Sequence, residues 1–364
     1  MSESLSRPQI ETAIQDYVDP YLEQSLLDAR AIKNIQVNGD NVSVDVELGF
    51  PARSYHKRLA DELEQRIKSL PGVKAVTVNV ASKITIHEVQ KGLKPLPGVK
   101  NIIAVASGKG GVGKSTTAVN LALALQAEGA RTGLLDADIY GPSQPRMLGV
   151  HQRPDTRDGK RLEPVLGHGL QAMSIGFLID EETPMVWRGP MVTQALQQLL
   201  GDTNWDDLDY LVIDLPPGTG DTQLTLAQKV PVSGAVIVTT PQDIALLDAR
   251  KGLKMFEKVE VPVLGVVENM SIHICSNCGH QEPIFGEGGG QRMAEQYNVN
   301  FLGALPLDIQ IREQADNGHP TVAADPDGRI GMLYREVALR TAAKLALTAR
   351  NFSHKFPNIV IQNN

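Results

Sequence analysis

One glycine-rich stretch constrains the fold of this chain more than any other feature. It reads GKGGVGKS from Gly108 to Ser115, between an apolar, β-branched run at residues 101–106 and a helical run at residues 114–127. Glycines let a loop curl closely around phosphates, and the helix behind the loop offers unpaired N–H groups and a positive dipole end. The stretch therefore predicts a strand, a phosphate-binding loop and a helix in succession.

Two lysines and a serine in this loop have predicted roles of their own. Lys114 should reach the β- and γ-phosphates of a nucleotide, and Ser115 should place its hydroxyl on Mg²⁺. Lys109 is not needed to hold phosphates from within one subunit. We expect it to act on the nucleotide of a partner subunit, in the manner of an arginine finger, and a solvated loop lysine is the alternative. The residues expected to surround the phosphates are Gly108, Lys109, Gly110, Gly111, Val112, Gly113, Lys114, Ser115 and Thr116.

From residue 99 onward, short apolar runs alternate with helical segments. Runs that are apolar on every side suit a parallel sheet covered on both faces. A long last helix is expected at residues 331–350. The expected strands cover residues 101–106, 132–135, 210–213, 235–239, 263–267 and 301–305.

Residues 1–90 follow a different pattern, with an expected order of helix, strand, strand, helix and strand. This order predicts a small α+β domain. Its expected elements cover residues 10–21, 32–37, 42–48, 55–70 and 73–80. Residues 91–98 contain two prolines and two glycines, which predicts a linker, so the larger α/β domain should comprise residues 99–364.

Carboxylates follow two of the expected strands. Asp136 and Asp138 lie at the end of residues 132–135, and Asp214 follows residues 210–213. The carboxyl ends of parallel strands form the edge of the sheet where ligands bind. A carboxylate that ends a buried strand is suited to hold Mg²⁺ through its water shell, as we expect of Asp214. The alternatives are a turn after Asp214, and strand-end caps for the other two.

The sequence Cys275-Ser276-Asn277-Cys278-Gly279 contains both cysteines of the chain. Two thiolates at this spacing can chelate one metal atom, because the turn between them brings both sulfurs to the same side. One such pair supplies half of a four-thiolate shell, which suits either zinc or a [4Fe–4S] cluster. Thioredoxin-like redox chemistry uses the same spacing in a different strand and helix context.

Charge and hydropathy exclude some classes of protein. The formal net charge of −7 argues against general nucleic-acid binding, which requires a basic footprint. No apolar stretch approaches the length of a bilayer-spanning helix, and the first residues lack the pattern of a signal peptide. We therefore expect a cytoplasmic protein with reduced cysteines that binds neither membrane nor nucleic acid.

The loop from Gly108 to Thr116 resembles the deviant Walker A motif. The family with this motif includes nitrogenase iron protein, the partition ATPases and the septum-site ATPases. The resemblance implies a P-loop NTPase fold of the nitrogenase iron protein type, with a mostly parallel sheet and helices on both faces. It also implies a homodimer that sandwiches ATP between face-to-face subunits, with Lys109 as the signature lysine.

The same resemblance assigns roles beyond the loop. Asp138 would polarise the attacking water, with support from Asp136, and the N–H of Gly218 would sense the γ-phosphate. Asn269 matches the side chain that reads the adenine base, and Pro306-Leu307-Asp308 resembles a second base-contacting segment. The catalytic residues expected on these grounds are Lys109, Lys114, Asp138 and Asp214.

Several further motifs closely resemble the Mrp/ApbC family of iron–sulfur cluster carriers, across nearly the whole chain. The N-terminal domain resembles the small domain that bacterial members carry ahead of the ATPase. The motifs are Asp138-Ile139-Tyr140-Gly141-Pro142-Ser143, Trp187-Arg188-Gly189-Pro190-Met191, Asp214-Leu215-Pro216-Pro217-Gly218-Thr219-Gly220-Asp221, Glu268-Asn269-Met270-Ser271, the cysteine pair with Gly279, Ile284-Phe285-Gly286 and Gly288-Gly289-Gly290.

This second resemblance implies a slow ATP hydrolase whose main role is to carry clusters. Cys275 and Cys278 from two subunits would hold one [4Fe–4S] cluster at the homodimer interface. An upstream donor would supply the cluster, and apo iron–sulfur proteins would accept it. An N-terminal cysteine motif of some eukaryotic relatives is absent here, which excludes a second cluster of that kind.

Two other functions remain open from the sequence. A positioning ATPase that switches on DNA or a membrane would share the phosphate loop and the dimer. The negative net charge argues against DNA binding, and Pro357 in the short tail would break a membrane-binding helix. A positioning ATPase would also leave the cysteine pair without a role. A zinc-stabilised dimer with ATPase activity would use the same four thiolates.

Overall fold

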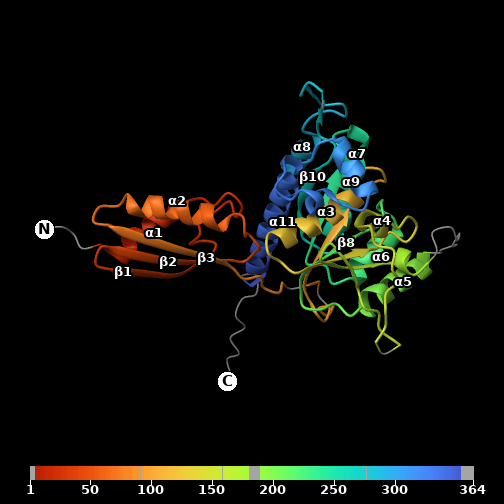
Figure 1. Cartoon of the computed structure of the whole chain (residues 1–364), viewed down its shortest axis with the longest axis horizontal. Helices are drawn as coiled ribbons and strands as arrows, with labels where there is room; N and C mark the ends of the chain where they lie inside the picture. The colour runs from red at the N-terminus through yellow and green to blue at the C-terminus, as the bar shows by residue number, and fades with distance from the viewer. Residues whose placement is uncertain are drawn as a thin grey trace, which may run out of the picture. The chain divides into compact units, whose positions relative to one another are not determined.

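The computed structural model describes residues 5–87, 89–90, 92–157, 159–179, 189–275 and 277–353 (Figure 1). Its contacts divide the chain into two compact units, one comprising Met1–His87 with Ala342–Asn364, and the other Glu88–Thr341. The predicted bounds of the domains, residues 1–90 and 99–364 with a linker at 91–98, stay a prediction. Trp187, Arg188, Ser276 and Pro357 lie outside the described residues.

The smaller unit has the predicted order of helices and strands. Strand β2 pairs antiparallel with β1 and parallel with β3, in the order β1-β2-β3. Helices α1 and α2 lie against the sheet (Figure 1). The elements are α1 (Arg7–Gln15), β1 (Ile32–Asn38), β2 (Asn41–Leu48), α2 (His56–Lys68) and β3 (Ala75–Ser82).

Hydrophobic periodicity explains how the helix α2 meets this sheet. Buried and exposed residues alternate along β2, as expected of a strand with one face in the core. On α2, Leu59, Leu63 and Ile67 recur every four residues and are fully buried. These two apolar faces form the core of the unit.

The larger unit contains an eight-stranded sheet in the order β13-β10-β9-β4-β8-β5-β7-β6. All neighbours pair in parallel except β6 and β7, which form an antiparallel hairpin at one edge. Every residue of β8 and β9 is buried, which agrees with the predicted sheet covered by helices on both faces. The strands are β4 (Val99–Ala106), β5 (Thr132–Asp136), β6 (Val165–Gly167), β7 (Leu170–Ser174), β8 (Leu208–Asp214), β9 (Gly234–Thr239), β10 (Val263–Glu268) and β13 (Phe301–Ala304).

Helices follow most of the parallel strands and connect each to the next. Helix α3 lies against β4, β5 and β8 and is buried from Thr117 to Leu125, a stretch in which all residues except Thr117 and Asn120 are apolar. Among the described residues, no helix is long and apolar enough to span a membrane. The helices are α3 (Lys114–Ala127), α4 (Gln144–Leu148), the 3₁₀ helix η1 (Ile175–Phe177), α5 (Gly189–Gly201), α6 (Asp221–Lys229), α7 (Asp243–Lys258), α8 (Gly289–Gln296), α9 (Ile309–Asp316), α10 (Thr321–Ala324) and α11 (Arg329–Ser353).

The hairpin of β6 and β7 was not predicted. Its turn residues His168 and Gly169 both have positive φ, of 50° and 83°, as a tight two-residue hairpin turn requires. A histidine at the first of these positions is not the usual Asn-Gly or Asp-Gly signal. Strand β6 has only three residues, so its periodicity carries little information.

Candidate functional site

The glycine-rich loop turns from β4 into α3 through two residues in the left-handed region, Gly111 and Gly113, each with a φ of +80°. A Cβ atom at Gly113 would lie 2.0 Å from Nδ2 of Asn269. At Gly108, a Cβ would lie 2.1 Å from the carbonyl carbon of Asp248 in α7. Glycine is therefore required at Gly113 for both conformation and space, and at Gly108 for space.

A cavity of about 200 Å³ lies within the curve of this loop. Seven of the predicted phosphate-binding residues line it, from Lys109 to Thr116. Asp138, Ser143 and Met147 close it from the segment after β5, and Pro217 closes it from the segment after β8. The volume is below the roughly 300 Å³ at which pockets for drug-sized ligands begin, so the space suits phosphate groups.

Lys114 and Asp214 form a buried ion pair beside this cavity. The Lys114 ammonium lies against one carboxylate oxygen of Asp214 and also 3.2 Å from Oγ of Ser115. The other oxygen of Asp214 accepts a hydrogen bond of 2.8 Å from Nε2 of Gln144. The predicted phosphate lysine, Mg²⁺ serine and Mg²⁺ carboxylate are thus brought together.

Asp136 is fully buried next to this ion pair, because the register of β5 and β8 places it directly beside Asp214. It accepts hydrogen bonds of 3.1 Å from the N–H groups of Asp138 and Gln144 and from the hydroxyl of Ser174. Burial, and then the negative charge of Asp214, raise the pKa of Asp136. These hydrogen bonds hold the segment that follows β5 in place.

Asp138 differs from Asp136 because it lines the cavity. Burial raises the pKa of its carboxyl group, while the positive charge of Lys114 acts in the opposite direction. A carboxylate here faces the space where phosphates are expected. This position is compatible with the predicted role in polarising water.

The amide of Gly218 is hydrogen-bonded within the chain, and its contact with a γ-phosphate stays a prediction. Its N–H donates a hydrogen bond of 3.0 Å to the carbonyl oxygen of Ser107, at the end of β4. The residue has a φ of +103°, so its place in the turn favours glycine. Contact between this N–H and a γ-phosphate would require the bond to Ser107 to break.

Asn269, after β10, is buried against the phosphate loop. Its Nδ2 donates a hydrogen bond of 2.9 Å to the carbonyl oxygen of Val112. Its own N–H donates to the carbonyl oxygen of Thr239 at the end of β9. Asn269 therefore supports the loop, and contact with adenine remains a prediction.

The chain beyond Asn269 is tied to the segment after β13, which was the second predicted base contact. Both the N–H and the hydroxyl of Ser271 donate to the carbonyl oxygen of Leu305. The N–H of Leu307 donates to Ile272, and Nδ1 of His273 lies 3.2 Å from the carbonyl oxygen of Leu307. These bonds tie the short segment between Asn269 and the cysteine pair to the segment after β13.

The cysteine pair occupies the turn of a small hairpin made by β11 (His273–Ile274) and β12 (Gln281–Glu282). The Cys275 N–H donates to His280, and the Gly279 N–H donates back to Cys275, each at 2.9 Å. Gly279 has a φ of +72°, which explains why glycine follows the second cysteine.

The hairpin turn lowers the pKa of one of its two thiols, that of Cys275. Cys278 is exposed and Cys275 is half-buried. The backbone N–H groups of Cys278 and Asn277 and the side chain of Cys278 donate toward the Cys275 sulfur and hold its pKa below the usual range of a thiol. A thiolate is the form that binds metal. Among the described residues, no His, Cys, Asp or Glu joins the pair in a group of three that could hold a metal ion.

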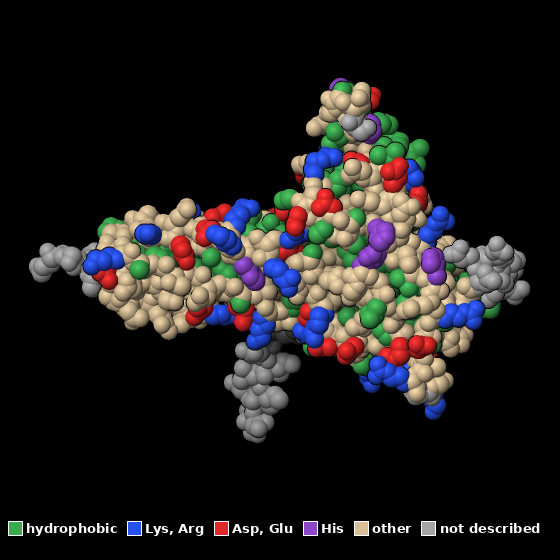
Figure 2. All heavy atoms as spheres, viewed as in Figure 1, with side chains coloured by type: hydrophobic (Ala, Val, Ile, Leu, Met, Phe, Trp, Pro, Cys, Tyr) green, Lys and Arg blue, Asp and Glu red, His purple; other side chains and the backbone are tan. Residues whose placement is uncertain are grey.

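Three large apolar side chains after the hairpin and on α7 are exposed. Ile284 follows β12, and Ile244 and Leu247 lie on the first turns of α7, with relative exposures of 51%, 70% and 54%. Figure 2 shows hydrophobic side chains gathered over α7, next to the projecting end of the larger unit. We call these three residues the apolar patch.

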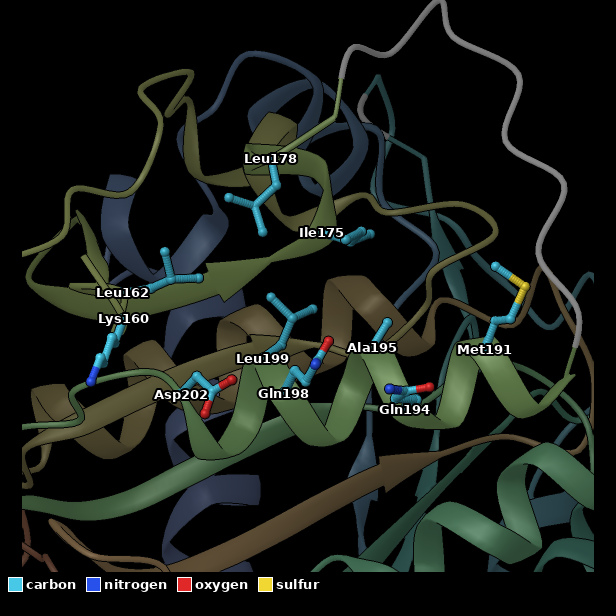
Figure 3. A pocket seen from close by; sticks show the side chains of 10 residues that line it. All are labelled: Lys160, Leu162, Ile175, Leu178, Met191, Gln194, Ala195, Gln198, Leu199 and Asp202. Atoms are coloured by element: carbon cyan, nitrogen blue, oxygen red, sulfur yellow. The ribbon is translucent and has the colours of Figure 1, made fainter.

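A larger cavity, of about 520 Å³, lies away from these residues. Figure 3 shows Leu162 and Leu178 across the cavity from Leu199 of α5, with Met191 at one end. Among the described residues, its walls include none of the predicted site residues. The volume of a cavity alone therefore does not identify the candidate functional site.

Sequence reasoning missed two residues that the structure brings to the site, Gln144 and Ser174. Gln144 in α4 contacts Asp136 through its backbone N–H and Asp214 through its side chain, and the Ser174 hydroxyl at the end of β7 contacts Asp136. Gln144 directly follows a quoted motif, but nothing in its spacing indicates contact with Asp214. Ser174 lies on the strand that was not predicted.

Comparison with known proteins agrees with this geometry. A family model described as NUBPL iron-transfer P-loop NTPase matches residues 98–342, and one described as iron-sulfur cluster assembly protein matches residues 7–80. The iron-sulfur cluster carrier protein of Escherichia coli strain K12 is 52% identical over 340 residues, which cover 93% of this chain and 92% of the relative. The protein of the same name from Pseudomonas fragi is 62% identical over 78% of this chain and 99% of its own.

A solved structure resembles the larger unit. It is a nucleotide-binding protein from Archaeoglobus fulgidus in complex with ADP, with cobalt found in it. It is 38% identical and has a TM-score of 0.56 over 64% of this chain and 90% of its own. These matches confirm the resemblance that the motifs indicated. The chain belongs to the family of iron–sulfur cluster carrier proteins with a P-loop NTPase domain.

Proposed function

We propose that the protein binds and slowly hydrolyses ATP, holds a [4Fe–4S] cluster at a homodimer interface and transfers it to apo-proteins in the cytoplasm. The observation that carries the proposal is the cysteine hairpin, with two accessible sulfurs and no third ligand among the described residues. Four thiolates complete the shell of such a cluster, so a second copy of the hairpin is needed. Residues 91–98 are proposed to link the cluster-binding ATPase domain to the small N-terminal domain.

The residues at the phosphate loop fit a Mg²⁺–nucleotide. The Ser115 hydroxyl and the Asp214 carboxylate are the hard oxygen donors that Mg²⁺ prefers, and Mg²⁺ bound there would neutralise charge on the phosphates. Lys114 would exchange its bond to Asp214 for one to the phosphates. Asp138 would orient and polarise the attacking water, and Lys109 would act on the partner's nucleotide.

Cluster transfer would proceed by ligand exchange. A thiolate of the acceptor forms one iron–sulfur bond as the bond to Cys275 or Cys278 breaks, so charge is conserved and no iron is oxidised or reduced. The exposed position of Cys278 supports access by an acceptor. The apolar patch supports contact with a second copy, because exposed apolar side chains that gather on a surface mark interaction sites.

The short path from the loop to the hairpin supports coupling between ATP and the cluster. Asn269 contacts Val112, and six residues further on the chain reaches Cys275 through bonds to Leu305 and Leu307. A change in loop conformation on nucleotide binding would therefore reach the hairpin through a segment of six residues that is hydrogen-bonded at Asn269, Ser271 and His273.

The test compares cluster transfer to an apo-acceptor by the native protein and by Lys114→Ala, with ATP present. We expect Lys114→Ala to hold its cluster, judged by visible absorption, but to transfer it without any response to ATP. Lys57→Ala, which removes a largely exposed lysine of the small unit, is the matched control. If transfer by Lys114→Ala still responds to ATP as in the native protein, the proposed coupling between ATP and cluster transfer is wrong.

A zinc-stabilised dimer is the second candidate, because four thiolates satisfy both metals. Anaerobic purification separates the two. A brown protein with acid-labile sulfide supports the cluster, whereas a colourless protein that takes up only zinc supports the alternative.

A further inference from the structure

Gln144, the first residue of α4, joins the three segments that surround the predicted Mg²⁺ site. Its side-chain Nε2 donates to the Asp214 carboxylate at 2.8 Å and to the carbonyl oxygen of Ser115 at 3.0 Å. Its backbone N–H donates to Asp136 at 3.1 Å. The side chain is almost fully buried, so these bonds are shielded from water.

The bond from Gln144 becomes more important once a nucleotide is bound. In this structure the Asp214 carboxylate has two side-chain partners, Lys114 on one oxygen and Gln144 on the other. Lys114 must leave Asp214 if its ammonium is to reach the phosphates. The donor from Gln144 then remains to fix the direction of a carboxylate that lies beside a second buried carboxylate, Asp136.

Two buried oxygen atoms at the start of α4 point to a further ligand. Among the described residues, Oε1 of Gln144 and Oγ of Ser143 are buried without a hydrogen-bond partner. Ser143 lies in the wall of the phosphate cavity. Buried polar atoms are normally paired, and the waters around a hydrated Mg²⁺ are donors of the kind that these oxygens lack.

We propose that Gln144 is a positioning residue for the Mg²⁺–nucleotide, which holds Asp214 directed at the ion after Lys114 has moved to the phosphates. The inference rests on the proposed nucleotide-binding function. It assigns to Gln144 a role in Mg²⁺ binding that neither the glycine loop nor Asp214 performs. A residue with only a packing role would leave the Mg²⁺ requirement unchanged.

The test uses Gln144→Leu in the full chain, because leucine keeps much of the volume and removes the side-chain donors and acceptor. The backbone bond to Asp136 is retained. Binding of a fluorescent, non-hydrolysable ATP analogue is titrated with Mg²⁺ at fixed pH. We expect the half-saturating Mg²⁺ concentration to rise about tenfold, the usual effect of one lost hydrogen bond to a charged group.

Three other variants keep the outcome interpretable. Gln144→Met should give the same shift, and it replaces Gln144→Leu if that variant does not fold. Gln144→Glu should give a smaller shift than Gln144→Leu, because it also loses the donor to Asp214 but adds a carboxylate that attracts Mg²⁺. Gln198→Leu, on the exposed side of α5, should leave the Mg²⁺ titration unchanged.

The result separates this inference from the function on which it rests. Weaker analogue binding at an unchanged Mg²⁺ midpoint would show a packing role for Gln144 and overturn the inference, as would no change at all. Failure of the unaltered protein to bind the analogue with Mg²⁺ would overturn the proposed function and the inference with it.

Discussion

The phosphate loop and the cysteine hairpin differ in how much of a binding site one chain completes. At the loop, Lys114, Asp136 and Asp214 are buried, and each has partners within the same chain. At the hairpin, Cys278 is exposed, and no third metal ligand is present among the described residues. One chain therefore lines the phosphate cavity by itself, where the partner's Lys109 is proposed to be added, but supplies only two ligands to the proposed metal site.

This difference implies that the two sites respond differently to mutation. A site inside one fold depends on close packing, so an added atom disturbs it. A site shared between two copies depends on its ligands and on assembly, and its surroundings tolerate more change. The following experiments examine that contrast, beginning with the largest expected effect.

Replacing either cysteine should abolish cluster binding. Cys275→Ser and Cys278→Ser should each reduce iron and sulfide to background after anaerobic reconstitution, because each dimer loses two of its four ligands. Nucleotide affinity, measured by calorimetry, should stay within about twofold. Asn277→Ala is the control, since the contribution of Asn277 to the turn is its backbone N–H. A cluster retained by both serine variants would place the ligands elsewhere.

Gly113→Ala should disrupt the nucleotide site and spare the hairpin. The new Cβ would meet Nδ2 of Asn269 and would occupy a left-handed conformation. We expect nucleotide affinity to fall about thirtyfold or more, since strain and steric clash together exceed about 2 kcal/mol. Iron content after reconstitution should be unchanged. Native affinity in this variant would contradict the close approach of Asn269 to the loop.

Gly279→Ala is the matching change at the hairpin, and its effect should be much smaller. Gly279 also has a positive φ, but its added Cβ would meet no atom within 4 Å. The cost is then backbone strain of about 1 kcal/mol, or a roughly fivefold loss of affinity for a Zn²⁺ probe. Gly141→Ala, at another open position without positive φ, should have no effect. An effect as large as that of Gly113→Ala would remove the contrast between the sites.

The pH dependence of thiol alkylation should show the influence of the turn on Cys275. Its pKa is lowered by the N–H groups that face its sulfur, so the thiolate forms at lower pH in the folded protein than in the unfolded chain. With Cys278→Ser, which leaves one thiol, the midpoint of iodoacetamide reactivity should lie lower in buffer than in urea. An equal or higher midpoint in buffer would contradict the hydrogen bonding.

Much of the architecture could be predicted because its signals are local. The strands on either side of the glycine loop are continuous apolar runs, and the helix after it follows from its sequence. The hairpin of β6 and β7 was missed because β6 is short and its turn begins with His168. Its pairing depends on the neighbouring strand β5, which no local pattern reveals.

The residues of the candidate site also divide into those that a local sequence pattern indicates and those that it does not. Lys114, Ser115 and Asp214 could be identified because their residue types occur at fixed positions around a strand and a glycine loop. Gln144 could not, because its role depends on the register that places Asp136 beside Asp214. The partner of the Gly218 N–H also depends on a distant strand, since it is the carbonyl of Ser107.

The central claim is that two chains must meet to complete the metal site. The most direct measurement determines mass by sedimentation, with iron and sulfide analysis, on anaerobically reconstituted protein. The account predicts that all cluster sediments with a dimer, at about two irons per chain, and that the cluster-free fraction contains monomer. A four-iron cluster on a particle with the mass of one chain, 39.4 kDa, would contradict it.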